Sequence, residues 1–161
     1  MKKEIFSTLF PVVKHEIVEV VVNALTTKTR FNLPDLQNLR NVKLRNAEMF
    51  TRENVSISPT GVPIVTALDL QRSYLTLQGY NGLEFLHQAP APSLHYQFDA
   101  DQNTELLQKE FTNQRVNYPK SYIEFFPTVV PPTTFSFLLS VYYTDMTEEE
   151  MNKANTFNNK S

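Results

Sequence analysis

The stretch Phe135-Ser136-Phe137-Leu138-Leu139-Ser140-Val141-Tyr142-Tyr143 decides the fold class of this chain. Every second residue from Phe135 to Tyr143 is large and apolar, and a period of two places those side chains on one face of an extended segment. The pattern predicts a long, mostly buried strand. Near the other end, residues 17–22 are dense in β-branched side chains, which pack well on a pleated surface and predict a second strong strand.

Shorter strand signals lie between these two segments. Val42 and Leu44 alternate in one phase, Ala47 and Met49 in the other, and this slip of one residue predicts a β-bulge within one strand. Two alternating runs on either side of residues 79–82 predict a hairpin with a four-residue loop. The predicted strands cover residues 17–22, 29–33, 41–52, 55–57, 74–78, 83–86, 94–98, 121–126 and 135–143.

Helical signals are weak by comparison. Residues 100–114 carry a few apolar side chains at helical spacing, which predicts one or two turns inside a long connection. The polar residues 146–161 predict a C-terminal tail that is either a frayed helix or disordered. We therefore divide the chain into residues 1–13 as an N-terminal arm or first strand, residues 14–145 as one β domain, and the tail.

The composition fits a single globular β domain. A chain of 161 residues has the length of one domain, and 41% hydrophobic residues can form one core. Ten prolines against three glycines indicate stiffened loops. Because the strands are joined by long connections rather than two-residue turns, we expect an all-β, antiparallel sandwich of the jelly-roll type with about eight strands and little helix.

No pattern of reactive side chains indicates catalysis. The chain has no cysteine, so it has neither a thiolate nucleophile nor a disulfide. His15, His87 and His95 have no metal-ligand spacing, and three glycines are too few for a nucleophile elbow or a phosphate-binding loop. We expect no catalytic residue, no metal, no cofactor, no small-molecule substrate and no enzymatic activity.

Two groups of polar residues are candidates for contact with partners. Arg40, Lys43 and Arg45 lie in a basic interval that either faces nucleic acid or phospholipid or is an ordinary solvated sheet face. The net charge of −2 argues against a dedicated nucleic-acid binder. Tyr80 and Asn81 occupy the predicted hairpin tip, where Tyr80 either contacts a partner or folds back onto the loop.

The N-terminal arm is a third candidate contact. It carries the apolar residues Ile5, Phe6, Leu9 and Phe10. On an isolated monomer such an exposed group usually marks an interface, so the arm either binds a neighbouring subunit or an underlying membrane, or forms the first strand of the sandwich. The longest uncharged apolar stretches are far shorter than the roughly 20 residues of a membrane-spanning helix.

Two stretches of this chain carry a resemblance to a known family. The first is Leu33-Pro34-Asp35-Leu36-Gln37-Asn38-Leu39-Arg40 with Val42-Lys43-Leu44; the second combines Leu75-Thr76-Leu77, Gly82-Leu83-Glu84-Phe85-Leu86 and Pro90-Ala91-Pro92-Ser93-Leu94. Together they resemble small jelly-roll coat proteins of tailless icosahedral phages, including lipid-containing ones. The resemblance implies a capsid subunit, as a penton or capsomer component, and implies no catalytic residues.

We therefore expect a structural protein that assembles into a ring with itself and with other capsid proteins. Its place would be the virion, assembled in the host cytoplasm, with viral membrane or genome as further contacts of the arm or the basic residues. The alternative is a jelly-roll binding module that recognises a carbohydrate or a receptor as part of a spike.

Overall fold

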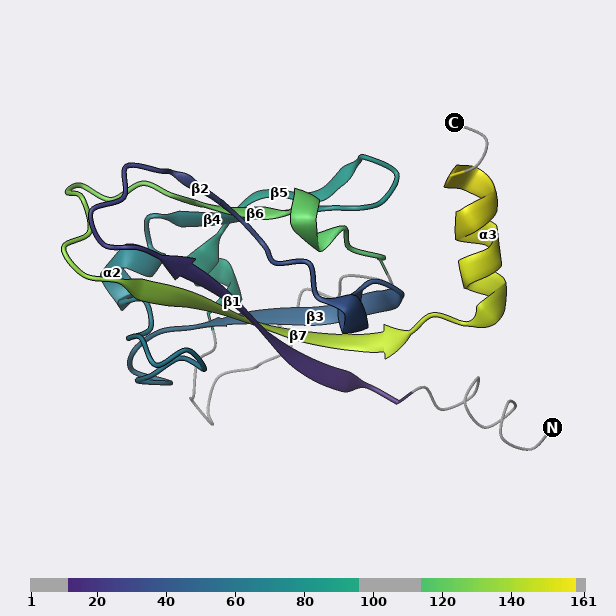
Figure 1. The fold of residues 1–161 in the computed structure, drawn as a ribbon, viewed down its shortest axis with the longest axis horizontal. Coiled ribbons are helices and arrows are strands. Elements are labelled where there is room, and N and C mark those ends of the chain that lie inside the picture. The colour runs from purple at the N-terminus through teal and green to yellow at the C-terminus, as the bar shows by residue number, and fades with distance from the viewer. Residues whose placement is uncertain (1–11, 96–113, 159–161) are drawn as a thin grey trace.

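The computed structural model describes residues 12–95 and 114–158, and their strands form two antiparallel sheets (Figure 1). The first sheet has the strand order β1-β7-β3 and the second the order β2-β6-β4-β5. The strands are β1 (Lys14–Val22), β2 (Arg30–Asn32), β3 (Val42–Phe50), β4 (Ser73–Gln78), β5 (Glu84–Pro90), β6 (Tyr122–Phe125) and β7 (Phe135–Asp145). The helices are α2 (Ala67–Leu70), α3 (Glu148–Asn158) and the 3₁₀ turns η1 (Gln37–Leu39), η2 (Ala91–Leu94) and η4 (Tyr118–Lys120).

This strand order is that of a jelly-roll sandwich, as the sequence predicts. The first strand pairs with the last, β2 pairs with β6, and β4 pairs with β5, always antiparallel. The described residues contain seven strands, close to the predicted eight. Leu44 of β3 also forms an isolated antiparallel bridge with Gln114.

Alternate residues of β7 form the middle of the core. In the register with β1, Val18, Val20 and Val22 lie opposite Leu139, Phe137 and Phe135. All six are buried. Phe125 of the second sheet meets Phe135 and Phe137 edge to face, with ring centroids 5.5 and 5.6 Å apart. Such pairs add about 1 kcal/mol each to the burial of apolar area, so this aromatic cluster joins the two sheets.

The predicted bulge in β3 is confirmed. The pairing of β3 with β7 shifts register between Leu44 and Asn46, which leaves Arg45 as the extra residue. Because of that insertion, Val42 and Leu44 before the bulge and Ala47 and Met49 after it all face the core.

The predicted strand at residues 55–57 is wrong. Ile57 forms only an isolated bridge with Pro63, across a turn in which Gly61 has a φ of 88°. Pro63 has no N–H to donate, so a ladder cannot extend from that bridge. The helix α2 was not predicted; Thr66 caps it by accepting a hydrogen bond from the backbone N–H of Asp69 at 3.2 Å.

The C-terminal residues are helical rather than disordered over most of their length. Three glutamates, Glu148, Glu149 and Glu150, occupy the first turn of α3, where carboxylates interact favourably with the helix dipole. Lys43 Nζ lies 2.9 Å from Glu150 Oε1, which joins α3 to β3 at the end of the sandwich where β7 finishes (Figure 1).

Two predictions concern residues that lie outside the described ones. These are nearly all of the predicted helix at 100–114 and residues 96–98 of the predicted strand at 94–98. In the described part of the chain, no helix is both long and apolar enough to cross a membrane.

Candidate functional site

The predicted N-terminal contact residues Ile5, Phe6, Leu9 and Phe10 lie outside the described residues. The first two described residues, Val12 and Val13, are exposed apolar side chains that precede β1.

Tyr80 at the hairpin tip is folded against a neighbouring segment. The guanidinium carbon of Arg115 lies 3.9 Å from the centre of the Tyr80 ring, and Arg115 also donates to the backbone oxygen of Arg40 at 2.9 Å. Asn81 Oδ1 accepts from the backbone N–H of Leu83 at 3.1 Å. Both residues therefore stabilise the loops at this end, and Arg115 covers one face of the tyrosine ring.

The predicted basic group is largely neutralised by carboxylates of this chain. Arg40 forms an ion pair with Asp35 at 2.6 Å, and Lys43 forms the pair with Glu150 described above. Arg45 is exposed at the bulge. An attractive potential for nucleic acid needs several uncompensated cations on one surface, and this group does not supply them.

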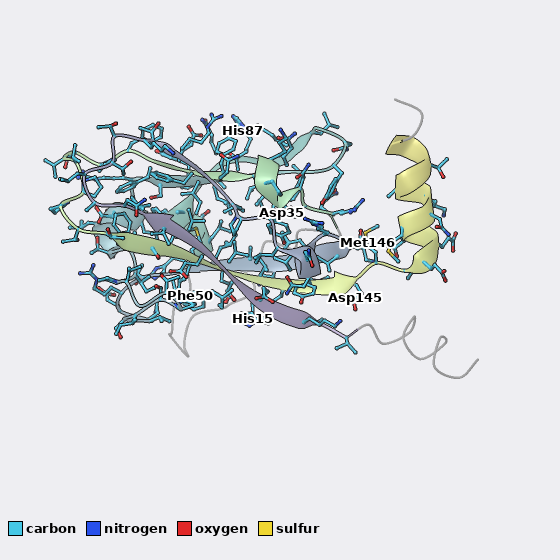
Figure 2. The ribbon with its side chains drawn as sticks, viewed as in Figure 1. His15, Asp35, Phe50, His87, Asp145 and Met146 are labelled. Atoms are coloured by element: carbon cyan, nitrogen blue, oxygen red, sulfur yellow. The ribbon has the colours of Figure 1, made fainter. Side chains whose placement is uncertain are left out.

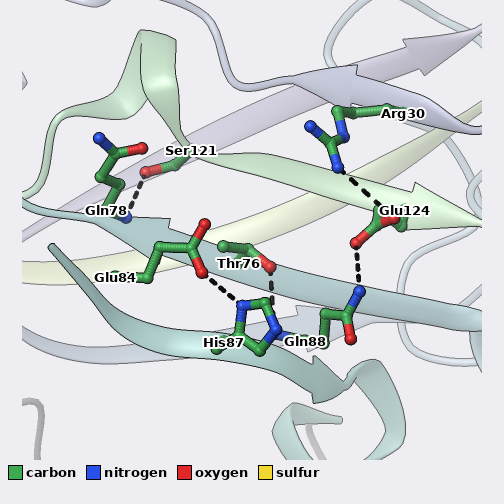
Figure 3. A network of polar contacts seen from close by, with 8 residues as sticks. All are labelled: Arg30, Thr76, Gln78, Glu84, His87, Gln88, Ser121 and Glu124. Atoms are coloured by element: carbon green, nitrogen blue, oxygen red, sulfur yellow. Dashed lines mark hydrogen bonds and ion pairs between the residues drawn. The ribbon is translucent and has the colours of Figure 1, made fainter. Parts of the chain in front are cut away.

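The outer face of the four-stranded sheet carries a polar network (Figure 3). In the strand register, Arg30 of β2 lies opposite Glu124 of β6, Glu124 opposite Tyr74 of β4, and Tyr74 opposite Pro90 of β5. We call these four residues the cross-strand row. With neighbouring strands about 4.8 Å apart, the row is about 14 Å long.

Glu124 is the central charge of the row. Its residue is only 8% exposed although it is on the outer face of the sheet. Gln88 Nε2 donates to Glu124 Oε1 at 3.1 Å, while the guanidinium of Arg30 lies 3.9 Å from Oε2 and 3.9 Å above the Tyr122 ring. Burying a carboxylate is costly unless hydrogen bonds replace its water, and among the described residues the long Arg30 contact is the one that Oε2 makes.

A second bulge positions Gln88 for this contact. The β4–β5 register moves by two residues on β4, from Leu75 to Leu77, but by three on β5, from Ala89 to Leu86. Gln88 has a φ of 45°, a left-handed conformation that costs a residue with a Cβ about 1–2 kcal/mol. Its backbone N–H donates to Thr76 Oγ1 at 3.1 Å. Bulges and strained residues are common where a strand redirects a side chain toward a site.

An exposed aromatic side chain lies beside the row. Phe126 is 47% exposed, and its ring meets that of Tyr74 edge to face at 6.1 Å. None of these residues was predicted as a site. The row brings together positions from 30 to 124, so only the strand register could reveal it.

The outer face of the three-stranded sheet holds polar side chains with a structural role (Figure 2). Glu19 Oε1 accepts from Thr60 Oγ1 at 2.6 Å and from Ser136 Oγ at 2.7 Å. His15 Nε2 contacts Ser140 Oγ at 2.5 Å. Ser140 is fully buried, so this serine–histidine pair offers no accessible nucleophile.

Exposed apolar side chains gather at one end of the sandwich, and we call Leu25, Leu68, Val129 and Val130 the loop-end patch. They lie on the connections β1–β2, β3–β4 and β6–β7, at the end where α2 lies (Figure 1). The backbone N–H of Leu25 donates to the carbonyl of Pro131 at 2.8 Å, and a pocket of about 210 Å³ separates the α2 region from the β6–β7 connection.

Among the described residues, no group of three or more histidine and acidic side chains could hold a metal ion. Comparison of the chain with protein-family models, with curated proteins and with solved structures gave no match.

Proposed function

We propose that this chain is a virion structural protein, a capsid subunit that assembles with itself and with other coat proteins into a ring of an icosahedral shell. The observation that carries the proposal is the jelly-roll strand order, β1-β7-β3 against β2-β6-β4-β5, in a single short domain. Jelly rolls of this kind are common building blocks of viral shells. The proposed role is non-enzymatic, and assembly would take place in the host cytoplasm.

The loop-end patch supports self-association. Leu25 is 74% exposed and Val129 is 70% exposed, and one backbone hydrogen bond, from Leu25 to Pro131, joins their two connections. Several exposed apolar side chains at one end of a domain are typical of an interface rather than of a surface that stays in water. A closed ring would bury this patch against a neighbouring copy through a heterologous contact.

Light scattering of the purified full chain over a range of concentrations tests the proposal. We expect a closed oligomer that Val129→Ser weakens and that Leu83→Ser leaves intact. Leu83 is 68% exposed and lies on the β4–β5 connection, at the end of the sandwich opposite α2 (Figure 1). Removal of residues 1–13 tests the N-terminal arm separately. A monomer at every concentration would contradict the proposal.

The second candidate function is a jelly-roll module that binds a carbohydrate or a receptor. The buried carboxylate and the exposed aromatic ring on the outer face of the four-stranded sheet favour it. This candidate predicts ligand affinity in a chain that stays monomeric, so the mass measurement distinguishes the two.

A further inference from the structure

We propose that the cross-strand row, together with Gln88 and Phe126, is a binding site for a neutral oligosaccharide. This inference deepens the binding-module candidate and is independent of assembly through the loop-end patch, which lies on other residues. A ring of capsid subunits and a monomeric module would both present this sheet face.

The first argument is chemical. A sugar presents hydroxyl groups around its ring and patches of C–H groups on its faces. Glu124 Oε2 can accept a hydrogen bond from a hydroxyl, and the half-exposed Arg30 guanidinium can donate to one. The ring of Phe126 supplies an apolar surface on which the C–H groups of a sugar can pack.

The second argument is that the site is built at a cost to the fold. Glu124 is buried with one side-chain hydrogen bond, of 3.1 Å, among the contacts of the described residues, and Gln88, which makes that bond, has a left-handed backbone. An apolar pair at these positions would satisfy the sheet equally well. Strain and incomplete satisfaction on the same two side chains are features that functional sites retain.

The third argument concerns charge. Glu124 and Arg30 balance one another, and Glu84 lies in contact with His87 at the near edge of the sheet (Figure 3). The face therefore has no excess of positive charge that would select a phosphate or a sulfated chain. Its length of about 14 Å and its polar, aromatic lining fit a short neutral oligosaccharide.

An array of neutral and acidic oligosaccharides probed with the fluorescently labelled full chain tests the proposal. The strongest neutral oligosaccharide is then titrated by calorimetry against the wild type and two variants. We expect Glu124→Gln and Phe126→Ala each to weaken binding at least tenfold, whereas the control Ile57→Ala, at an exposed apolar position outside both the cross-strand row and the loop-end patch, leaves it unchanged.

Gln88→Gly separates a binding role from a structural one. Glycine relieves the left-handed backbone but removes the amide that orients Glu124, so we expect the melting temperature to be maintained or raised while oligosaccharide affinity falls at least tenfold. Binding to acidic oligosaccharides only, no binding to any array member, or binding that Glu124→Gln and Phe126→Ala leave intact would each overturn the proposal. A monomeric chain that binds as expected would contradict the assembly role alone.

Discussion

Leu25 combines a left-handed backbone with an exposed apolar side chain. Its φ of 61° is left-handed, a conformation that a leucine adopts only at a cost of about 1–2 kcal/mol, and its side chain is exposed. The fold itself holds the strained backbone, because the N–H of Leu25 donates to the carbonyl of Pro131 at 2.8 Å, and only the exposed side chain is available to the proposed interface.

Replacing Leu25 by asparagine should stabilise the monomer. Asparagine tolerates the left-handed region better than leucine, so we expect Leu25→Asn to raise the free energy of unfolding by about 0.5 kcal/mol and to weaken self-association. Urea unfolding at a concentration where the protein is monomeric, together with light scattering, measures both effects. Leu68→Asn, at an exposed position of α2 with an ordinary backbone, is the control and should give no such gain. An unchanged or lower stability of Leu25→Asn would contradict the prediction.

Tyr118 offers a second test at a single side chain. Its hydroxyl is buried and has no hydrogen-bond partner among the described residues, and burial raises the pKa of Tyr118 far above its usual range. A buried hydroxyl without a partner costs about 1–3 kcal/mol. We therefore expect Tyr118→Phe to raise the free energy of unfolding by about 1 kcal/mol in urea titrations. A loss of stability would show that the hydroxyl has a partner, such as an ordered water.

At the scale of the elements, strand positions could be predicted well because burial imposes a period of two. β7 and β1 follow from alternating and β-branched residues, and the shift in phase between Leu44 and Ala47 predicts the β3 bulge that the register confirms. The full length of β5 was not predicted. Its bulge at 87–88 interrupts the alternation, so the strand pattern ended at Leu86 although pairing continues to Pro90.

The cross-strand row could not be predicted from the chain for a related reason. Arg30, Tyr74 and Glu124 are ordinary surface residue types, and each by itself is compatible with a solvated strand face. Only the register of β2, β6 and β4 places them side by side. Sequence patterns specify which residues face outward, whereas the order of strands across a sheet depends on contacts between distant parts of the chain.

The long β3–β4 connection is attached to the first sheet through Glu19, and this attachment should depend on pH. Burial raises the pKa of Glu19, but hydrogen bonds from the hydroxyls of Thr60, Ser58 and Ser136 outweigh it and hold the pKa below its usual range. The unfolded chain, with a carboxyl pKa of about 4.3, thus binds more protons than the folded chain as the pH falls. The stabilisation is complete above that pH and is lost as the pH falls through the lower folded-state value.

The difference between wild type and Glu19→Gln isolates this effect. We expect Glu19→Gln to lower the free energy of unfolding by about 1 kcal/mol at pH 7, with a difference that shrinks below about pH 4. Glu48, whose pKa is raised by burial, titrates in both proteins and cancels in the comparison. Urea titrations from pH 3 to pH 7 provide the measurement. A difference that stays constant with pH would show that Glu19 acts through packing alone.

At the scale of the whole molecule, the jelly-roll order makes folding depend on contacts between distant residues. β1 pairs with β7 across more than one hundred residues, since Lys14 lies opposite Tyr143, and β2 pairs with β6 across a separation nearly as long. Among the strands of the described residues, only β4 and β5 are both paired and adjacent in the chain. Domains dominated by distant pairings fold in milliseconds to seconds rather than microseconds.

This topology predicts which strands form early. The hairpin closes a short loop and loses little chain entropy, whereas β1 gains its partner only after β7 is in place. We therefore expect Leu77→Ala in β4 to slow refolding and Val18→Ala in β1 mainly to speed unfolding, as measured by stopped-flow kinetics across a urea series. Both side chains are buried, and each truncation should cost about 2–4 kcal/mol, which is enough to resolve the two rates. If Val18→Ala instead slows refolding as strongly as Leu77→Ala does, β1 and β7 are already paired in the folding transition state. The chain must then bring these two distant strands together before the β4–β5 hairpin can stabilise the second sheet.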